Sequence, residues 1–299
     1  MTPARQSVRT GAGRGESLVE GDLLLTYEDF RRIAAMLHDD AGIFLPEGKV
    51  TLVYSRLAKR LRALGLQSFR DYCEIVASAE GIDERKRMLA QLTTNVTRFF
   101  REPHHFEHLK TQVLPGLVAK AKAGGRVRLW SAACSSGQEP YSMALTLLSL
   151  MPDAADYDVK ILATDIDPNI LAEARRGIYG EDAVSQIPSS LRQAWLAPAD
   201  SRGRKSWAVK PEVQDLIAFR ELNLIGDWPM KGTFQVIFCR NVVIYFEEQT
   251  QIKIWNRFKN LMPDGGRLYI GHSERVAGTG NDFETDGLTT YRRVGGPSR

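Results

Sequence analysis

The chain is organised around the stretch Leu129–Ser142, LWSAACSSGQEPYS. It begins as the end of an apolar strand, passes through very small residues and resumes as a helix that Pro140 can open. Small side chains let a ligand approach the backbone, and the free N–H groups of a helix start favour a polar or anionic ligand. By itself the stretch also fits a simple tight turn, so the rest of the chain must decide.

Length and composition set broad limits. With 299 residues, 43% of them hydrophobic, the chain can form one large domain or two modest ones. Its net charge of +4 neither requires nor excludes a nucleic-acid partner. Cys73, Cys134 and Cys239 are far apart and lack CxxC spacing, so we expect reduced thiols rather than disulfides or a metal site.

The sequence predicts neither a signal peptide nor a membrane span. No apolar run approaches the roughly 20 residues needed to cross a bilayer. The start, Met1–Gly21, is rich in Arg, Gly and Ser and has no apolar h-region. We therefore expect residues 1–22 to form a disordered tail and the protein to be cytoplasmic.

Residues 23–92 have the pattern of four short helices, which predicts a small all-α domain. Thr26 with Asp29 is typical of a capping box, and the apolar positions that follow have helical spacing. In the second helix, Arg56, Lys59 and Arg60 share one face. This face is either a solvated surface or a docking stripe for an acidic partner.

A polar segment with an aromatic pair, Leu92–Phe106, follows the helices. Phe99 and Phe100 are expected to pack into the core of the domain that follows. His104 and His105 have no third ligand at metal spacing in the sequence, so we predict no metal site. A helix is expected over 106–122.

Two successive β-α units then predict a parallel sheet with right-handed crossovers. The first is the opening stretch with its helix, Tyr141–Leu150, and the second begins with the strand Asp158–Asp167. Asp165 ends that strand where doubly wound folds bind a ribose, whereas Asp167 is placed to cap the helix at Pro168.

The alternation of strand and helix patterns stops over residues 177–223, which we predict to be an insertion with its own small antiparallel sheet. In it, 207–209 and 216–219 are expected to pair. The α/β pattern returns with a buried strand over 234–238, a helix over 249–261 and a strand over 267–270, and residues 289–294 are expected to close the sheet.

Three loops should converge at the carboxyl ends of the strands, namely 131–139, 165–167 and 239–245. A dinucleotide site is poorly supported because GxGxxG is missing. An adenosine cofactor without phosphates has less need of such a glycine-rich loop. S-adenosylmethionine is such a cofactor.

Five short segments stand in order along the chain: TTNVTRFFRE (93–102), SAACSSGQEPYS (131–142), ATDID (163–167), FCRNVVIYF (238–246) and GHSE (271–274). Together they resemble the chemotaxis receptor methyltransferases of the CheR type, and the resemblance extends from about Leu23 to Val294. It implies an N-terminal helical domain (23–92) and an α/β, Rossmann-like methyltransferase domain (93–299) with a small β-subdomain (177–223).

The resemblance also implies the reaction. A methyl group passes from S-adenosylmethionine to glutamate side chains on the cytoplasmic helices of methyl-accepting chemoreceptors, leaving methyl esters and S-adenosylhomocysteine. A glutamate with a pKa of about 4.3 is ionised at pH ~7, so its oxygen needs no general base. The enzyme must supply positioning.

The same resemblance implies roles for particular residues. Arg101 would lie near the methyl-transfer centre and hold a carboxylate, and Tyr245 would line the methyl path. Without the family, these residues fit a surface ion pair and a core aromatic. The implied cofactor-binding residues are Asn95, Thr97, Arg101, Glu139, Asp165, Asn223, Leu224, Arg240 and Asn241. Methylated receptor helices are acidic, so Arg56, Lys59 and Arg60 become a candidate docking face.

Two alternatives remain open. One is a methyltransferase acting on nucleic acid or on another protein residue, although Arg240–Val243 lacks the prolines of an N/D-PPY loop. The other is a regulatory or scaffold protein that binds the cofactor without turnover. The expected partners are chemoreceptors, with no nucleic acid and no direct membrane insertion.

Overall fold

The computed structural model describes residues 17–93, 95–201 and 203–295, which fall into two compact units, Met1–Thr94 and Asn95–Arg299. Most of the predicted N-terminal tail, residues 1–16, lies outside the described residues. Each unit has its own buried apolar core.

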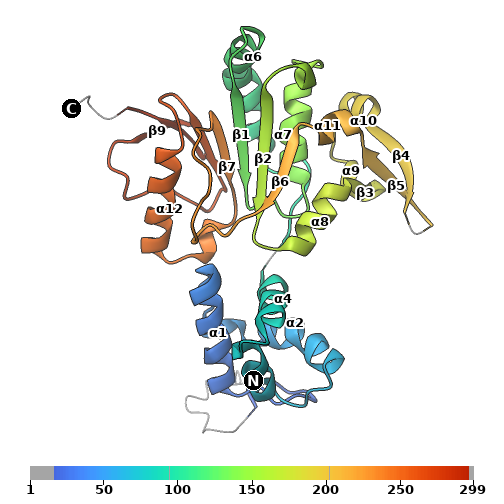
Figure 1. Cartoon of the computed structure of the whole chain (residues 1–299), viewed down its shortest axis with the longest axis vertical. Helices are drawn as coiled ribbons and strands as arrows, with labels where there is room; N and C mark the ends of the chain where they lie inside the picture. The colour runs from blue at the N-terminus through green and yellow to red at the C-terminus, as the bar shows by residue number, and fades with distance from the viewer. Residues whose placement is uncertain (1–16, 94, 202, 296–299) are drawn as a thin grey trace, which may run out of the picture. The chain divides into compact units, whose positions relative to one another are not determined.

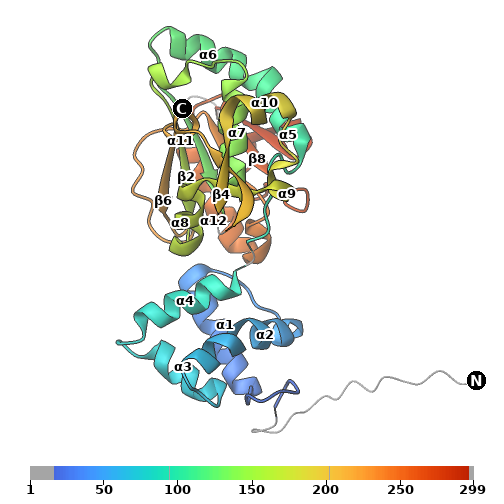
Figure 2. The ribbon, with the colours of Figure 1, turned by 90° about the vertical axis from the view of Figure 1, so that its right-hand side faces the viewer.

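The first unit is all-α, and Figure 2 shows its helices grouped together. They are α1 (Tyr27–Ala41), the 3₁₀ turn η1 (Glu47–Lys49), α2 (Val50–Ala63), α3 (Phe69–Ala77) and α4 (Ile82–Leu92). The predicted capping box at Thr26 is confirmed, since its hydroxyl accepts from the Asp29 amide and Asp29 bonds back to the Thr26 amide. Ser68 caps α3 by accepting from the Asp71 amide.

The second unit is mixed α/β, and its helices and strands alternate as the sequence predicts. The elements before the small sheet are α5 (Pro103–His108), the π-helix η2 (Leu109–Val113), α6 (Leu114–Lys122), β1 (Val127–Ala132), α7 (Gln138–Leu148), η3 (Ala154–Asp156), β2 (Val159–Asp165) and α8 (Pro168–Arg176). Those of the small sheet are β3 (Ile178–Gly180), α9 (Glu181–Val184), α10 (Ser189–Trp195), β4 (Leu196–Ser201) and β5 (Arg204–Val209). Those after it are α11 (Pro211–Gln214), β6 (Ile217–Glu221), β7 (Val236–Cys239), η4 (Val243–Tyr245), α12 (Glu248–Asn260), β8 (Arg267–Ile270), β9 (Phe283–Gly287) and β10 (Thr290–Arg293).

The main sheet has the order β6-β2-β1-β7-β8-β10-β9 (Figure 1). Neighbouring strands pair in parallel across the series β6, β2, β1, β7 and β8. Strand β10 pairs antiparallel with both β8 and β9. The strand order reverses between β1 and its neighbours β2 and β7, so the topological switch point lies at the carboxyl end of β1. This fold confirms the predicted Rossmann-like class.

Both faces of β1 are buried, because successive side chains of a strand point to opposite faces. Leu129 belongs to the apolar cluster that contains Tyr141, Met143 and Leu145 of α7. Trp130 lies instead against Phe258 of α12, with ring centroids 5.2 Å apart. Helices therefore cover the two faces, as in an α/β sandwich.

One expected pairing was wrong. We expected 207–209 and 216–219 to pair in the inserted segment, but Trp207 lies in β5, which pairs with β3 and β4. Ile217–Glu221 forms β6, which pairs in parallel with β2 at the edge of the main sheet. An apolar run shows that a strand is buried but not which sheet it joins, and this run follows the small sheet directly in sequence.

The single helix expected over 106–122 is instead three pieces, α5, η2 and α6. Pro115 stands at the start of α6 and has no N–H to continue the bonding of the preceding turn. The backbone widens into the π-turn Leu109–Val113 just before it. Among the described residues, no helix is long and apolar enough to span a bilayer.

Candidate active site

The carboxyl ends of five parallel strands meet at one edge of the main sheet. The last residues of these strands are Ala132 of β1, Asp165 of β2, Glu221 of β6, Cys239 of β7 and Ile270 of β8. The polar side chains described below follow these ends. This edge is therefore the candidate active site.

The loop after β1 is held in an unusual backbone conformation. Ala133 and Ser135 have positive φ values of 66° and 50°, and Gly137 has φ 94° as the N-cap of α7. A Cβ on Gly137 would lie 2.9 Å from both Ala174 Cβ and Tyr179 Oη. Positive φ at residues with side chains is costly and concentrates at functional sites, which supports a ligand loop here.

Asp165 ties the loops after β1 and β2 together. Its Oδ2 accepts from the Ser135 amide at 2.8 Å, and its Oδ1 accepts from the Asp167 amide at 3.1 Å. Burial raises the pKa of Asp165 to about 6. Asp167 caps α8 by accepting from the Asn169 amide, as the sequence predicts. Each Asp165 oxygen keeps a second lone pair for a hydroxyl group.

The segment 95–102 lies against the same loop. The Ser135 hydroxyl donates to the Asn95 carbonyl at 3.0 Å, and the Phe100 amide donates to Ser142 Oγ at 2.9 Å. Thr97 is half-buried on this segment. Arg101 is also half-buried, and its Nη1 donates to the Val96 carbonyl at 2.9 Å.

Arg240, directly after β7, is the charged centre of the site. Its side chain is 2% exposed, and its guanidinium lies 3.4 Å from Glu139 Oε2 and 3.3 Å from Glu102 Oε2. It also donates to the Arg101 carbonyl. The Ser131 hydroxyl donates to the other oxygen of Glu139 at 2.7 Å. A single buried cation thus links β7, the start of α7 and the segment before α5.

Burial and charge act in opposite directions on these groups. Burial raises the pKa of Glu139, and Arg240 and Ser131 offset only part of that effect. Burial would also raise the pKa of Glu102, but Arg240 and His272 outweigh it, so this pKa is lowered. Burial lowers the pKa of Arg240 against the pull of both carboxylates.

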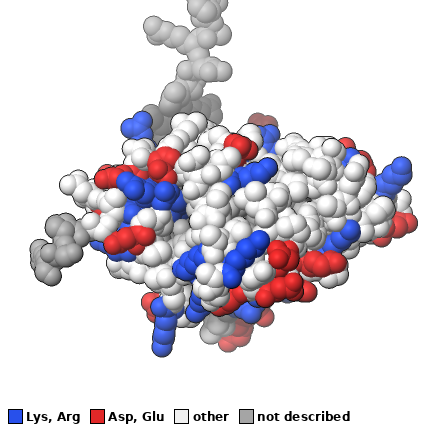
Figure 3. All heavy atoms as spheres, turned by 90° about the horizontal axis from the view of Figure 1, so that it is seen from above, with Lys and Arg blue, Asp and Glu red and all other residues white. Residues whose placement is uncertain are grey.

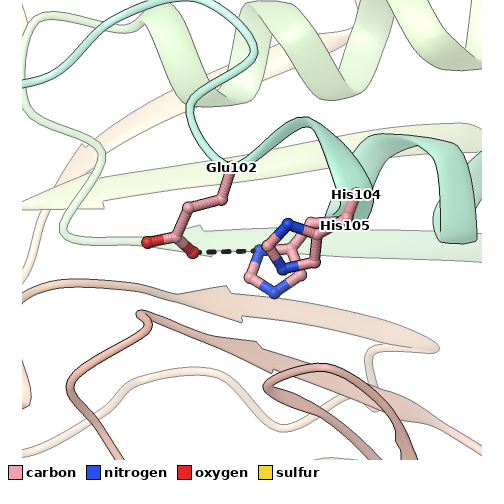
Figure 4. A group of neighbouring side chains, drawn as sticks. All are labelled: Glu102, His104 and His105. Atoms are coloured by element: carbon pink, nitrogen blue, oxygen red, sulfur yellow. Dashed lines mark ion pairs between the residues drawn. The ribbon is translucent and has the colours of Figure 1, made fainter.

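Glu102, His104 and His105 bring one ligand atom each within 4.8 Å of one another (Figure 4). The expectation that the two histidines lack a third neighbour was therefore wrong, because the positive φ of Glu102 turns its carboxylate toward them. His105 Nδ1 lies 3.4 Å from Glu102 Oε2, and burial and the nearby Arg240 lower the pKa of His105 to about 3. Since Arg240 already lies against that same oxygen, we assign the group to the Arg240 network and not to a metal.

The segment after β7 carries Asn241 and Tyr245. Asn241 has φ 58°, and its side chain packs over Gly271. Tyr245 ends the 3₁₀ turn η4 and is half-buried. The carboxylate of Glu274, in the turn after β8, accepts from the amides of this segment.

Asn223 and Leu224 follow β6 at the same edge. Asn223 Oδ1 accepts from the Ile225 amide at 3.1 Å, and the Leu224 carbonyl accepts from Trp228 Nε1 and Arg257 Nη1. The Leu222 amide donates to the Asp165 carbonyl at 2.9 Å. The implied cofactor residues on these different segments thus lie at one edge of one sheet.

The donor set fits a cofactor with an amino acid end and a ribose. Arg240 Nε and Asn241 Oδ1 are buried and have no hydrogen-bond partner in the described structure. Such orphaned groups are costly unless a ligand satisfies them. Glu139 suits an ammonium group, Asp165 suits ribose hydroxyls, and the small-residue loop allows close approach of an adenosine. These residues would hold S-adenosylmethionine, which supplies an activated methyl group when bound.

The candidate docking residues lie on α2 in the first unit. Arg60 donates two hydrogen bonds of 2.5 Å to the buried Glu84. Arg56 donates to the carbonyls at the end of α4, including Leu92 at 3.1 Å. Lys59 is exposed. Two members of the stripe therefore contribute to the packing of their own unit.

Sequence reasoning did not identify Glu102 and Glu274 as site residues. Both lie inside motifs that were recognised, TTNVTRFFRE and GHSE. Nothing in the spacing reveals that Glu102 contacts Arg240, because 138 positions separate the two residues (240 − 102).

Family models match nearly the whole described chain. "CheR methyltransferase, SAM binding domain" matches residues 95–292, and "CheR methyltransferase, all-alpha domain" matches residues 28–93. A probable chemotaxis protein methyltransferase of Rhizobium etli is 60% identical over 258 residues, which cover 86% of this chain and 96% of the relative. The chemotaxis protein methyltransferase of Escherichia coli is 37% identical over 270 residues, covering 90% and 92%.

Solved structures are similar at a much lower level. An O-methyltransferase family protein from Burkholderia thailandensis is 12% identical, with a TM-score of 0.34 over 67% of this chain and 43% of that one. The family assignment rests on the sequence matches. The chain belongs to the CheR family of chemotaxis methyltransferases and uses S-adenosylmethionine.

Proposed function

We propose that this chain methylates glutamate side chains on the cytoplasmic helices of methyl-accepting chemoreceptors, forming γ-glutamyl methyl esters for chemotactic adaptation. The proposal places the enzyme in the cytoplasm, where those helices lie. It assigns Arg101 to the acceptor carboxylate and Tyr245 to the path of the methyl group.

The observation that carries the proposal is the placement of Arg101. Its backbone carbonyl contacts Arg240, and its charge acts on Glu139 to lower the pKa of that carboxyl against the larger effect of burial. Its guanidinium makes an exposed bond to the Val96 carbonyl and has further N–H donors besides that one. A guanidinium beside a methyl donor suits an acceptor that is itself a carboxylate.

The chemistry supports the same acceptor. A carboxylate is already ionised at pH 7 and attacks the methyl carbon directly, so the site must align two groups and exclude water without a proton-abstracting base. His272 Nδ1 lies 3.1 Å from Glu102 Oε1, where it joins the ion-pair network. We assign it no catalytic role.

Nucleic acid is a weaker candidate substrate. On the face shown in Figure 3, the described Lys and Arg side chains are interspersed with Asp and Glu and form no single-sign patch. Nucleic-acid binders usually gather their basic residues on one face.

The test is a transfer assay with methyl-labelled S-adenosylmethionine, offering a purified receptor cytoplasmic domain and RNA side by side. We expect label on the receptor that mild alkali releases as methanol, because methyl esters hydrolyse and N-methyl groups do not. Alkali-stable label, or label on RNA alone, would reject the glutamate assignment. Calorimetric binding of S-adenosylhomocysteine without any transfer would favour a regulatory or scaffold role.

A further inference from the structure

A tight turn after β8 carries one buried carboxylate. The Glu274 amide donates to the Gly271 carbonyl at 2.9 Å, which closes the turn and aims the Glu274 side chain toward the end of β7. The residue is 4% exposed. No basic side chain is paired with this carboxylate among the ion pairs of the described residues.

Backbone amides surround the carboxylate instead. Oε2 accepts from the amides of Gly271 at 2.6 Å and Asn241 at 2.9 Å. Oε1 accepts from those of Val242 at 2.9 Å, Val243 at 3.0 Å and Ile244 at 3.4 Å. Four of the five donors therefore belong to the segment that follows β7.

Two of these amides, those of Val243 and Ile244, begin the 3₁₀ turn η4, and the other two directly precede it. The first N–H groups of such a turn have no partner within it and need an acceptor from elsewhere. Glu274 supplies that acceptor from the turn after β8, 33 positions from Asn241. The same bonds hold Asn241 at φ 58°, a conformation that the chain would otherwise leave.

The two turns also touch through Gly271. A Cβ there would lie 2.3 Å from Asn241 Nδ2 and 2.8 Å from the Asn241 backbone nitrogen. Only glycine allows the Asn241 side chain to lie over the turn at this distance. The segment after β7 is thus fixed both by packing on Gly271 and by hydrogen bonds to Glu274.

We propose that Glu274 is a positioning residue for methyl transfer, which sets the backbone of residues 241–244 and thereby places Asn241 and Tyr245 around the cofactor. The inference rests on the proposed function for its kinetic consequence. It does not require Glu274 to touch cofactor or substrate.

A purely structural role would not require a charged group. Burying a carboxylate is costly, and a loop at a sheet edge can satisfy its amides with water. Burial raises the pKa of Glu274, and the amide donors oppose this by stabilising the ionised form. The carboxylate therefore holds the backbone of residues 241–244 in one conformation, which water molecules bound to the same amides would not do.

The experiment compares Glu274→Ala, Glu274→Gln and a matched control, Asp286→Asn. Asp286 is a partly buried carboxylate that lies 3.4 Å from His108 and pairs with Arg267 at the opposite end of β8. Each full-length variant is measured for receptor methylation, S-adenosylhomocysteine affinity by calorimetry, thermal unfolding and amide hydrogen exchange.

Glu274→Ala is expected to lower kcat/KM by about 100-fold, the scale of a 1 Å misplacement, and to speed exchange of amides 241–244 selectively. Glu274→Gln keeps one acceptor oxygen and should recover about tenfold of the loss. Asp286→Asn should keep kcat/KM within threefold of the parent even where it lowers the unfolding temperature, because Asp286 lies at the opposite end of β8.

The inference is overturned if Glu274→Ala keeps both turnover and ligand affinity within threefold, or if Asp286→Asn loses as much activity at equal stability. If the parent protein methylates no receptor, the proposed function fails while the exchange and calorimetric arms still test the loop. Unchanged amide exchange at residues 241–244 in Glu274→Ala would then reject the inference about Glu274, independently of the proposed function.

Discussion

The Ser135 amide donates a 2.8 Å hydrogen bond to Asp165 Oδ2, which joins the loop after β1 to the end of β2. This bond holds Ser135 at φ 50° inside the buried edge of the sheet. The carboxylate is 6% exposed and has no basic partner among the described ion pairs. Asp165 therefore makes a structural hydrogen bond, and a ligand that donates hydrogen bonds to it would reduce the cost of burying its charge.

The first prediction concerns pH and stability. The folded-state pKa of Asp165, about 6, lies above its ordinary value of 3.8, so the folded chain binds this proton more tightly than the unfolded chain. Unfolding free energy should therefore rise as pH falls from 7 toward 4, by up to about 3 kcal/mol relative to Asp165→Asn. Parallel urea unfolding of the two proteins across this range checks the sign, and a constant difference would contradict it.

The second prediction concerns the cofactor product. Ribose hydroxyls bind the ionised form of Asp165 best, so S-adenosylhomocysteine affinity should fall as pH drops through about 6. Asp165→Asn should bind roughly 10- to 100-fold more weakly at pH 8, the scale of a hydrogen bond to a charged group, and lose this pH dependence. Calorimetry at several pH values measures both. A variant with the same pH dependence as the parent would remove Asp165 from the ribose.

The third prediction contrasts two glycines. Gly137→Ala should destabilise the protein by about 1–3 kcal/mol, because φ 94° strains an L-residue and the new methyl would lie 2.9 Å from Ala174 and Tyr179. Gly116→Ala, inside α6 with nothing within 4 Å of its Cβ, should stabilise by about 0.5–1 kcal/mol. Thermal unfolding of both proteins measures the contrast, and equal effects would show that backbone strain at Gly137 is not important.

The sequence predicts the fold well where local chemistry is decisive. The helix caps, the order of strands and helices along the chain and the edge at which the loops converge all follow from short-range patterns at residues such as Thr26 and Asp167. The family resemblance then assigns residues to that edge. These two sources of information agree in the main sheet.

Long-range partners could not be predicted. The pairing of β6 with β2, the contact of Glu102 with Arg240 and the bonds from Glu274 to the segment after β7 each join distant residues. Periodicity reports burial but not the partner. The positive φ of Glu102 likewise has no signal in the residue pattern, whereas Pro115 marks the break before α6 that the expected single helix overlooked.

The fourth prediction separates packing from docking on α2. Arg60→Ala removes the bidentate partner of the buried Glu84, which keeps the Tyr72 hydroxyl at 3.1 Å and Arg87 at 3.4 Å, and should destabilise by about 1–3 kcal/mol. Lys59→Glu should leave stability nearly unchanged and, if α2 docks the acidic receptor helix, lower kcat/KM for the receptor by about tenfold through slower association. The charge-matched control is Lys86→Glu, an exposed change on α4. Equal effects of the two lysine variants would assign the loss to net charge.

The last prediction tests Arg101, which the proposed function places at the acceptor carboxylate. Arg101→Ala should lower kcat by about 100-fold or more, because the carboxylate loses its charged hydrogen-bond donor, while the unfolding temperature shifts little for a half-buried side chain with one carbonyl bond. Arg98→Ala, an exposed arginine on the same segment, is the control and should keep its activity. Arg101→Lys should recover only part of the rate, since an ammonium cannot reproduce the planar pair of donors. Full activity in Arg101→Ala would move the acceptor site elsewhere, and a large loss of stability would show that the Val96 bond is its main role.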